Sequence, residues 1–413
     1  MIFEEMLDRY ARLLVFYALN VQPGQVVNIT TEPIHRDLAI RVAKFAYEAG
    51  AKYVNLDLGD PRLGRVRVLG SKEENLAFVP DFIKRQYVEL VDSRAANVRI
   101  IGSEEPDILA DLDPGKINCM RLHRHLALKY FYDEGIGKSL IHWTIGAAAT
   151  PKWGQKVFPR LSPDDACKRL WEEIFRICKL DRDDFLGAWR EHNAVLQTRA
   201  KKLTEMHIKE LHFSGPETDL RVSLSSNAIF KGGAEGGSLG VAFEPNIPTE
   251  EVFTTPDWRG TEGRVKTTRP FLINGKMIRD LYLEFKQGEI SHFSASSGAD
   301  TFQKYIESDD GAKRLGEVAL VGIDSPIYKS GLVFEEILFD ENAACHVAIG
   351  SAYKFCLKDG ATMTSKQLEE VGCNESTVHT DMMISSEQVD VTATAVSGEK
   401  MPLIRKGAWV ISA

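Results

Sequence analysis

The 413-residue sequence is poor in cysteine, and none of its six cysteines forms a C-x-x-C pair. This spacing excludes a zinc ribbon, and in a chain of this length the thiols are expected to be reduced and mostly buried. The sequence also lacks any run of lysine or arginine, and its formal net charge is -8. Because a nucleic-acid-binding surface needs a basic patch, we expect no nucleic-acid partner.

Long hydrophobic runs are missing as well. No segment approaches the roughly 20 consecutive apolar residues that cross a bilayer. The N-terminal segment, residues 1–21, has apolar residues at helical spacing but is interrupted by Glu4, Glu5, Asp8 and Arg9. A secretory signal instead has basic residues followed by an uninterrupted apolar stretch. We therefore expect a cytoplasmic protein with no membrane partner.

The glycine fingerprints of nucleotide-binding proteins are absent. Residues 25–29 and 53–58 read as strands on either side of a helix at 35–49, which predicts a right-handed parallel crossover. The turn after the first strand, residues 30–33, reads TTEP and has no glycine. The glycine-rich stretch 231–240 (KGGAEGGSLG) lacks the Gly-Lys-Ser/Thr ending of a phosphate loop. A loop between strands is the better interpretation.

The pattern of apolar and polar residues changes near the middle of the chain. Further strands at 98–101 and 139–143 predict an open α/β sheet in the first half, and residues 163–205 are helical in pattern. Beyond His207 apolar and polar residues alternate, as in 277–285, which is typical of antiparallel sheet with one solvated face. We predict an open α/β N-terminal domain, residues 1–200, followed by an α+β domain with largely antiparallel sheet, residues 201–413.

Polar groups with metal-binding chemistry gather in residues 334–353 (FEEILFDENAACHVAIGSAY). A helix is expected to begin near Asn342, with Glu341 just ahead of it. His346 and Tyr353 are one heptad apart and would lie close to one helix face. A carboxylate and an imidazole suit borderline divalent cations. A histidine beside a glutamate is equally consistent with a simple hydrogen-bonded pair.

Two further motifs place a carboxylate in an apolar setting. In residues 248–256 (PTEEVFTTP), Glu251 precedes a short apolar strand. In residues 311–321 (GAKRLGEVALV), Glu317 interrupts an apolar run. Burying such a carboxylate without a partner costs several kcal/mol or forces it to take up a proton, so Glu317 needs a strong partner. A turn acid at Glu251 and a salt bridge at Glu317 are the structural alternatives.

A fourth motif, residues 376–383 (STVHTDMM), places His379 and Asp381 two residues apart. In an extended strand both would project from the same face. Taken alone, they are equally consistent with a hydrogen-bonded surface pair.

The four motifs together supply four carboxylates and two imidazoles. Two divalent cations carry four positive charges, which four carboxylates neutralise while the imidazoles complete the coordination. Sites with two metal ions serve hydrolysis. The predicted set consists of Glu251, Glu317, Glu341, His346, His379 and Asp381.

In their order and spacing, these motifs resemble the thermophilic metalloaminopeptidases, the family typified by aminopeptidase T and including aminopeptidase II, AmpS and PepS. The resemblance extends to residues 270–275 (PFLING), 285–288 (FKQG) and 310–321 (DGAKRLGEVALV). It is looser in the first half, where it rests on residues 21–29 (VQPGQVVNI) and 47–54 (YEAGAKYV).

The resemblance implies a metal-dependent aminopeptidase that removes the N-terminal residue from peptides, with residues 201–413 as its catalytic domain. It further implies a homodimer, a smaller α/β N-terminal part that closes over the active site, and two divalent ions drawn from zinc, cobalt, manganese or magnesium. The implied ligands are Glu251, Glu317, His346, His379 and Asp381, with Glu341 as a further ligand or an acid behind the ligands. Tyr353 matches a tyrosine that assists at the reacting centre.

The residues themselves suggest catalytic roles without settling every one. The apolar flanks of Glu317 favour it as the ligand shared by both ions, and Tyr353 is placed to donate a hydrogen bond to an oxyanion. The proton carrier to the leaving amine is one of Glu251, Glu317 and Glu341, and the sequence does not choose among them.

Two other functions are consistent with the same motifs. A dinuclear phosphoesterase would need cations converging on the metals, and the motifs offer only Lys313, Arg314 and Lys354. A non-catalytic dimeric binding protein would require that the site formed by these residues has lost its catalytic activity.

Overall fold

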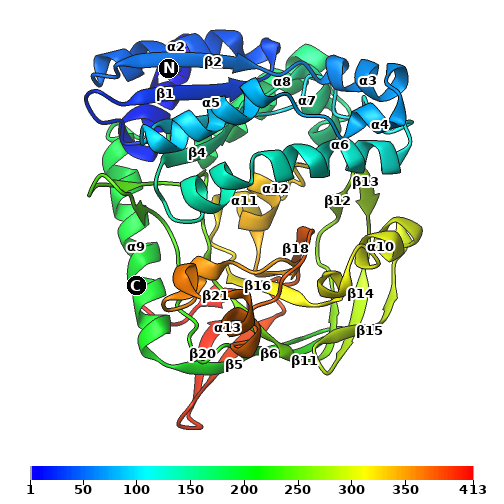
Figure 1. The fold of residues 1–413 in the computed structure, drawn as a ribbon. Helices are drawn as coiled ribbons and strands as arrows, with labels where there is room; N and C mark the ends of the chain where they lie inside the picture. The colour runs from blue at the N-terminus through cyan, green and yellow to red at the C-terminus, as the bar shows by residue number, and fades with distance from the viewer. Residues whose placement is uncertain (1, 413) are drawn as a thin grey trace. The chain divides into compact units, whose positions relative to one another are not determined.

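The computed structural model describes residues 2–412 (Figure 1). Contacts divide the chain into two compact units, Met1–Arg190 with Ala234–Pro248 and Glu191–Gly233 with Thr249–Ala413. The chain passes from the first unit to the second within helix α9 (Phe185–Glu205). The predicted domain boundary near residue 200 falls in the same helix and stays a prediction.

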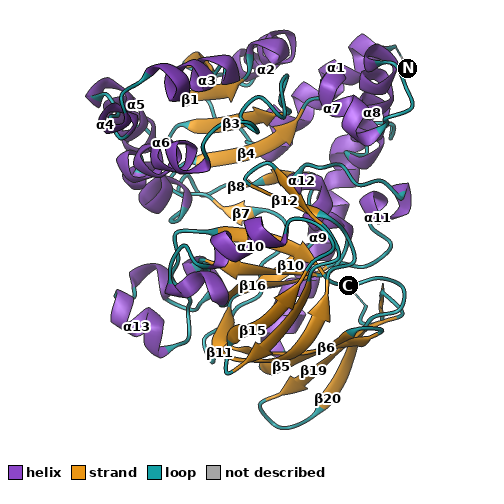
Figure 2. Ribbon diagram, turned by 90° about the vertical axis from the view of Figure 1, so that its right-hand side faces the viewer, coloured by secondary structure: helices purple, strands orange, loops and turns teal. Residues whose placement is uncertain are grey.

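The first unit contains a five-stranded parallel sheet with the order β2-β1-β3-β4-β9. Figure 2 shows β1, β3 and β4 side by side in one layer. Its strands are β1 (Val26–Thr31), β2 (Tyr53–Leu58), β3 (Ala96–Ile101), β4 (His142–Ala147) and β9 (Asn246–Ile247). The predicted strand at 139–143 was placed too early, since the observed strand runs on to Ala147. The open α/β fold and its parallel crossover are confirmed.

The helices of this unit often begin at proline. Pro at the first helical position has no N–H to satisfy, and a polar residue before it accepts a backbone N–H of the first turn. Asp60, Asp113, Thr150 and Ser162 do this for α3, α6, α7 and α8. The helices are α1 (Phe3–Arg12), α2 (Arg36–Glu48), α3 (Pro61–Gly70), α4 (Glu73–Leu76), α5 (Asp81–Asp92), α6 (Pro114–Ala127), α7 (Pro151–Val157) and α8 (Pro163–Ile177). Over residues 2–412 no helix combines the length and apolar character needed to cross a membrane.

The second unit is built on antiparallel sheets, as predicted. An eight-stranded sheet has the order β15-β14-β11-β6-β5-β19-β20-β21, and a four-stranded sheet has the order β10-β16-β17-β18. The large sheet consists of β5 (Ile208–Gly215), β6 (Thr218–Leu224), β11 (Pro256–Lys266), β14 (Tyr282–Lys286), β15 (Glu289–Ser294), β19 (Asp390–Ala395), β20 (Lys400–Arg405) and β21 (Ala408–Trp409). The small sheet consists of β10 (Val252–Thr254), β16 (Leu315–Leu320), β17 (His346–Gly350) and β18 (His379–Met383).

Shorter elements complete the two units. Two-stranded pairs are β7 (Glu235–Gly236) with β8 (Ala242–Phe243) and β12 (Phe271–Ile273) with β13 (Lys276–Ile278). The second unit also has the helices α10 (Ala299–Ile306), α11 (Pro326–Ser330), α12 (Ile337–Asp340) and α13 (Ser365–Glu370). Strand β7 lies in the glycine-rich stretch 231–240 that was expected to be a loop, and β8 follows just after it, so that expectation missed a two-residue strand.

The two central strands of the small sheet are buried on both faces. Every residue of β16 and of β17 is buried. Val318, Leu320, Val347 and Ile349 belong to one hydrophobic core with residues of the large sheet. The polar residues of β16 and β17 alternate with these apolar residues and therefore project from the opposite face.

The predicted helix beginning near Asn342 is wrong. Glu341–Ala343 forms a single 3₁₀ turn, and the residues after it form strand β17. This strand pairs with β16 on one side and with β18 on the other, so both neighbours satisfy its backbone. A short apolar run buried on two faces has no alternation that separates strand from helix, which explains the error. His346 and Tyr353 consequently share no helix face.

Candidate metal centre

The central strand β17 brings side chains from three strands onto one face. Cross-strand neighbours project from the same face of a sheet. Ala348 lies opposite Glu317 of β16 and also opposite Asp381 of β18. Ala319 of β16 lies opposite His346. The two alanines have only a methyl group, so they leave space between the carboxylates and the imidazole.

Gly350 extends this row of small residues. It lies opposite His379 at the start of β18. Its φ is +102°, and a Cβ added there would lie 2.0 Å from the carbonyl oxygen of Val378. Only glycine fits this position, because any side chain would push β18 and its histidine away from β17.

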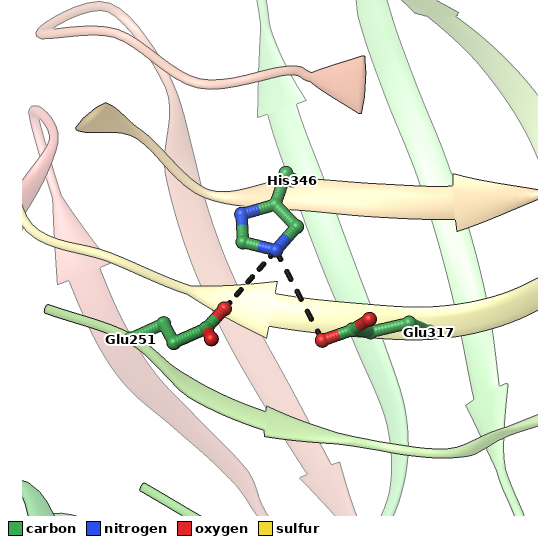
Figure 3. A group of neighbouring side chains, drawn as sticks. All are labelled: Glu251, Glu317 and His346. Carbon is green, nitrogen blue, oxygen red and sulfur yellow. Dashed lines mark ion pairs between the residues drawn. The ribbon is translucent and has the colours of Figure 1, made fainter. Parts of the chain in front are cut away.

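The first donor group consists of Glu251, Glu317 and His346, which converge in Figure 3. The His346 Nε2 atom lies 3.2 Å from Oε2 of Glu251 and 4.0 Å from Oε1 of Glu317. All three residues are buried, with 7%, 3% and 1% of their surface exposed for Glu251, Glu317 and His346. Polar side chains as deeply buried as these need either one another or a bound cation.

The second donor group consists of Glu317, His379 and Asp381. The His379 Nε2 atom lies 3.3 Å from Oε2 of Glu317 and 3.4 Å from Oδ1 of Asp381. In each group the potential ligand atoms lie within 4.8 Å of one another. Glu317 belongs to both groups and uses a different carboxylate oxygen toward each histidine.

Backbone carbonyls fix the orientation of both imidazoles. The Nδ1 atom of His379 lies 2.8 Å from the carbonyl oxygen of Ser351, and Nδ1 of His346 lies 3.3 Å from that of Ala344. When Nδ1 carries the only proton it donates to the carbonyl, and the lone pair of Nε2 is then available to a cation held among the carboxylates. Histidines that bind metals are commonly held in this way.

Glu341 is the predicted ligand that lies outside both donor groups. It begins the 3₁₀ turn, it is half-buried, and its carboxyl interacts electrostatically with Asp381 and Glu251. The Nδ2 atom of Asn342 donates to its Oε1 at 3.4 Å. The structure therefore brings five of the six predicted donors into two groups and places the sixth beside them. Their role as ligands stays a prediction.

Similarity to known proteins identifies the kind of protein that carries this site. The sequence matches the family model described as thermophilic metalloprotease (M29) over residues 3–409. The chain belongs to this family. It is 39% identical to aminopeptidase 2 of Geobacillus stearothermophilus over 406 residues, which cover 98% of each chain. It is 37% identical to aminopeptidase T of Thermus aquaticus over 410 residues, which cover 99% of each chain.

Comparison with a solved structure supports the same family assignment. The structure of wild-type AmpT from Thermus thermophilus matches with a TM-score of 0.92 at 36% sequence identity. The match covers 99% of this chain and 100% of that one. The family resemblance seen in the motifs and the α/β fold class predicted from the sequence pattern are both confirmed.

The electrostatics of this M29 site show why its acids need a cation. Burial raises the pKa of Glu317 to about 7 even though His379 opposes the shift. Loss of hydration, followed by the charges of Asp381 and Glu251, raises the pKa of Glu341 well above its usual range. Neighbouring carboxylates therefore resist ionising together.

The histidines are the only protein cations in the two donor groups. Burial by itself lowers the pKa of His346, but Glu251 and the nearby carboxylates outweigh it and raise the pKa well above the usual value. Burial likewise opposes protonation of His379, yet Asp381 and Glu317 raise its pKa well above normal. Burial favours the neutral form of Asp381, but the histidines hold its pKa below the usual range. The site thus stabilises positive charge at the position that the carboxylates share.

The donor chemistry fits a divalent metal. Carboxylate oxygens and imidazole nitrogens are the ligands that zinc, cobalt and manganese accept in proteins. When all four carboxyl groups are ionised, their charge exceeds that of the two imidazoles, and a cation offsets the excess. Membership of a metalloprotease family and the chemistry of this donor set both indicate a metal centre.

Several residues of the site were not predicted from the sequence to belong to it. Asn342 is fully buried, and its Oδ1 accepts a hydrogen bond from the backbone N–H of Glu250, so it links the Glu341 turn to the segment carrying Glu251. Phe253 and Phe355 pack against Tyr353. Only the position of Asn342 directly after Glu341 could have drawn attention to it.

Proposed function

We propose that this chain is an aminopeptidase whose activity depends on two divalent ions, drawn from zinc, cobalt, manganese and magnesium. The observation that carries the proposal is the position of Glu317, whose carboxylate is common to both donor groups. A carboxylate between two such groups is suited to bridge a pair of ions. The full-length relatives named aminopeptidase 2 and aminopeptidase T support an exopeptidase acting on peptides.

The proposed ligands of one ion are Glu251, Glu317 and His346, and those of the other are Glu317, His379 and Asp381. When bound, the ions supply Lewis acidity that activates a water molecule and polarises the scissile carbonyl. The remaining steps fall to groups of the chain. Glu341 is our candidate to hold a proton for the leaving amine, because its carboxyl lies beside the donor groups without belonging to either.

Tyr353 is the proposed hydrogen-bond donor to the tetrahedral oxyanion. Its hydroxyl lies 3.4 Å from Nε2 of His379. Loss of hydration, reinforced by the charges of Glu317 and Asp381, raises its pKa well above the usual value. The phenol therefore keeps its proton at neutral pH and remains able to donate.

The phosphoesterase alternative finds little support in this geometry. Among the three cations that the motifs offer, Arg314 pairs with Glu289 at 2.8 Å, and its guanidinium lies 3.9 Å from the centre of the Trp258 ring. Lys354 is exposed on the 3₁₀ turn Lys354–Cys356. The non-catalytic alternative conflicts with the complete set of six predicted donors.

The family resemblance also leads us to propose a homodimer in the cytoplasm, with domains at residues 1–200 and 201–413. These proposals rest on the resemblance and on sequence pattern.

The proposed function predicts a strict requirement for a free N-terminus. Leucine p-nitroanilide should be hydrolysed by the metal-loaded protein, whereas N-acetyl-leucine p-nitroanilide should react at least about a hundredfold more slowly, because the blocked nitrogen can no longer bind as an amine. Release of p-nitroaniline measures both reactions. Equal rates on the two substrates would contradict an exopeptidase, and release of phosphate from p-nitrophenyl phosphate without either amide reaction would favour the phosphoesterase.

A further inference from the structure

Three aromatic side chains of the second unit form a group that we name the aromatic triad: Phe253, Tyr353 and Phe355. The rings of Tyr353 and Phe355 stack with centroids 5.0 Å apart. Phe253 meets Tyr353 edge to face at 5.8 Å and Phe355 at 6.3 Å. All three residues are half-buried rather than enclosed in the core. Part of each residue therefore remains accessible.

The aromatic triad borders the donor groups directly. The Tyr353 ring lies 5.1 Å from the ring of His379, centroid to centroid. Phe253 lies opposite Ala319 of β16, which in turn lies opposite His346 of β17. Because cross-strand neighbours share a face, Phe253 projects on the same side of the small sheet as the donors. Ala319 contributes only a methyl group between Phe253 and His346.

This placement suits an apolar group attached close to the reacting carbonyl. In an aminopeptidase substrate the α-amine, the scissile carbonyl and the side chain of the first residue are all bonded to the same Cα atom. If the amine and the carbonyl both bind at the donors, the side chain of the first residue is held within a few bonds of them. The second residue has no comparable attachment and extends from the leaving nitrogen. Apolar surface bordering the donors is therefore best matched to the first side chain.

We propose that the aromatic triad binds the side chain of the N-terminal residue of the substrate and selects large apolar or aromatic residues at that position. This proposal rests on the proposed function. Aromatic side chains offer a large apolar area, and paired rings favour edge-to-face or offset contacts with a further ring. A phenylalanine or leucine substrate gains this contact, whereas an alanine substrate does not.

The test replaces Phe355, which, unlike Tyr353, is not among the proposed donors or catalytic groups, and which, unlike Phe253, does not lie on a strand of the small sheet. Phe355→Ala is expected to lower kcat/KM for phenylalanine p-nitroanilide about tenfold relative to alanine p-nitroanilide, within the range that apolar pocket contacts provide. Phe355→Leu should recover much of the discrimination. Bound metal per chain and the thermal midpoint are measured for every variant, so that a folding defect is recognised.

Phe293 provides the matched control. It is also a half-buried phenylalanine of the second unit in contact with one other ring, that of Phe302 at 5.0 Å. It lies on β15 of the large sheet and not on any of the strands that carry the donors. Phe293→Ala should leave the ratio of phenylalanine to alanine hydrolysis unchanged.

Three outcomes distinguish this proposal from the proposed function. An unchanged substrate ratio in folded, metal-loaded Phe355→Ala would overturn the proposal while leaving the aminopeptidase intact. A changed preference for the second residue of dipeptides, with no change for the first, would also overturn it. If the wild type hydrolyses no amide, the proposed function fails, and calorimetry decides the role of the triad: tighter binding of L-phenylalanine than of L-alanine, lost in Phe355→Ala, supports it, and equal binding refutes it.

Discussion

Glu317→Gln is expected to abolish amide hydrolysis, with a loss of at least about a thousandfold in kcat/KM. Glu317 is the residue common to both donor groups, with one oxygen near His346 and the other near His379. Glutamine keeps the shape but replaces one carboxylate oxygen by an amide nitrogen and removes the charge. Lewis-acid catalysis contributes several kcal/mol, and each ~1.4 kcal/mol corresponds to a tenfold change in rate.

The measurement combines steady-state hydrolysis of leucine p-nitroanilide with elemental analysis of bound metal. We expect fewer ions per chain in Glu317→Gln together with a folded protein, since the substitution removes a buried charge without leaving a cavity. Glu369→Gln is the matched control, because Glu369 is exposed on α13. Wild-type turnover in Glu317→Gln, or two tightly bound ions with normal activity, would refute the shared-ligand assignment.

Tyr353→Phe is expected to lower kcat about a hundredfold while KM and bound metal stay close to the wild-type values. The substitution removes only the hydroxyl, which lies 3.4 Å from Nε2 of His379. Loss of a single oxyanion donor costs about 10² to 10³ in kcat in enzymes that stabilise a tetrahedral intermediate. A donor that acts only in the transition state changes kcat and kcat/KM together and leaves KM unchanged.

The readouts for Tyr353→Phe separate its possible roles. Tyr282→Phe is the control, since the Tyr282 hydroxyl donates to Glu284 on the large sheet. A fall in bound metal that parallels the fall in activity would show that Tyr353 supports the metal centre rather than the oxyanion. A kcat equal to that of the wild type would show that the hydroxyl takes no part in the reaction.

The sequence alone located the acids and histidines because their chemistry is out of place in apolar segments. Glu317 interrupts an apolar run, and the structure buries it to 3% exposure in a strand of which every residue is buried. The two-residue spacing of His379 and Asp381 indicated one face of a strand, and β18 has that form. Such signals are local and need no knowledge of the fold.

Features that depend on strand pairing could not be predicted in this way. The segment that forms β17 was predicted to be a helix, because its burial on both faces removes the alternation of apolar and polar residues that marks a strand. Ala319 and Ala348 look like ordinary small residues until the register places them between the donors. Phe253 and Phe355 are about a hundred residues apart in the chain, and only the fold brings their rings into contact with each other and with Tyr353.

The division of the chain into two compact units also depends on strand pairing and could not be predicted from local sequence. Residues Ala234–Pro248 belong to the first compact unit although they follow the part of α9 that begins the second. Strand β9 has two residues and joins the parallel sheet by pairing with β4, about a hundred residues earlier. A strand this short has no periodicity, so its pairing is decided by tertiary contacts alone.

The most direct test of the central claim is a metal titration of the chelated protein. The protein is treated with EDTA, freed of chelator, and titrated with zinc, cobalt or manganese while hydrolysis of leucine p-nitroanilide is followed. The two donor groups predict that activity is lost on chelation and returns to its maximum when two ions are bound per chain. Full activity in the metal-free protein, or a maximum at one bound ion, would contradict the two-metal site.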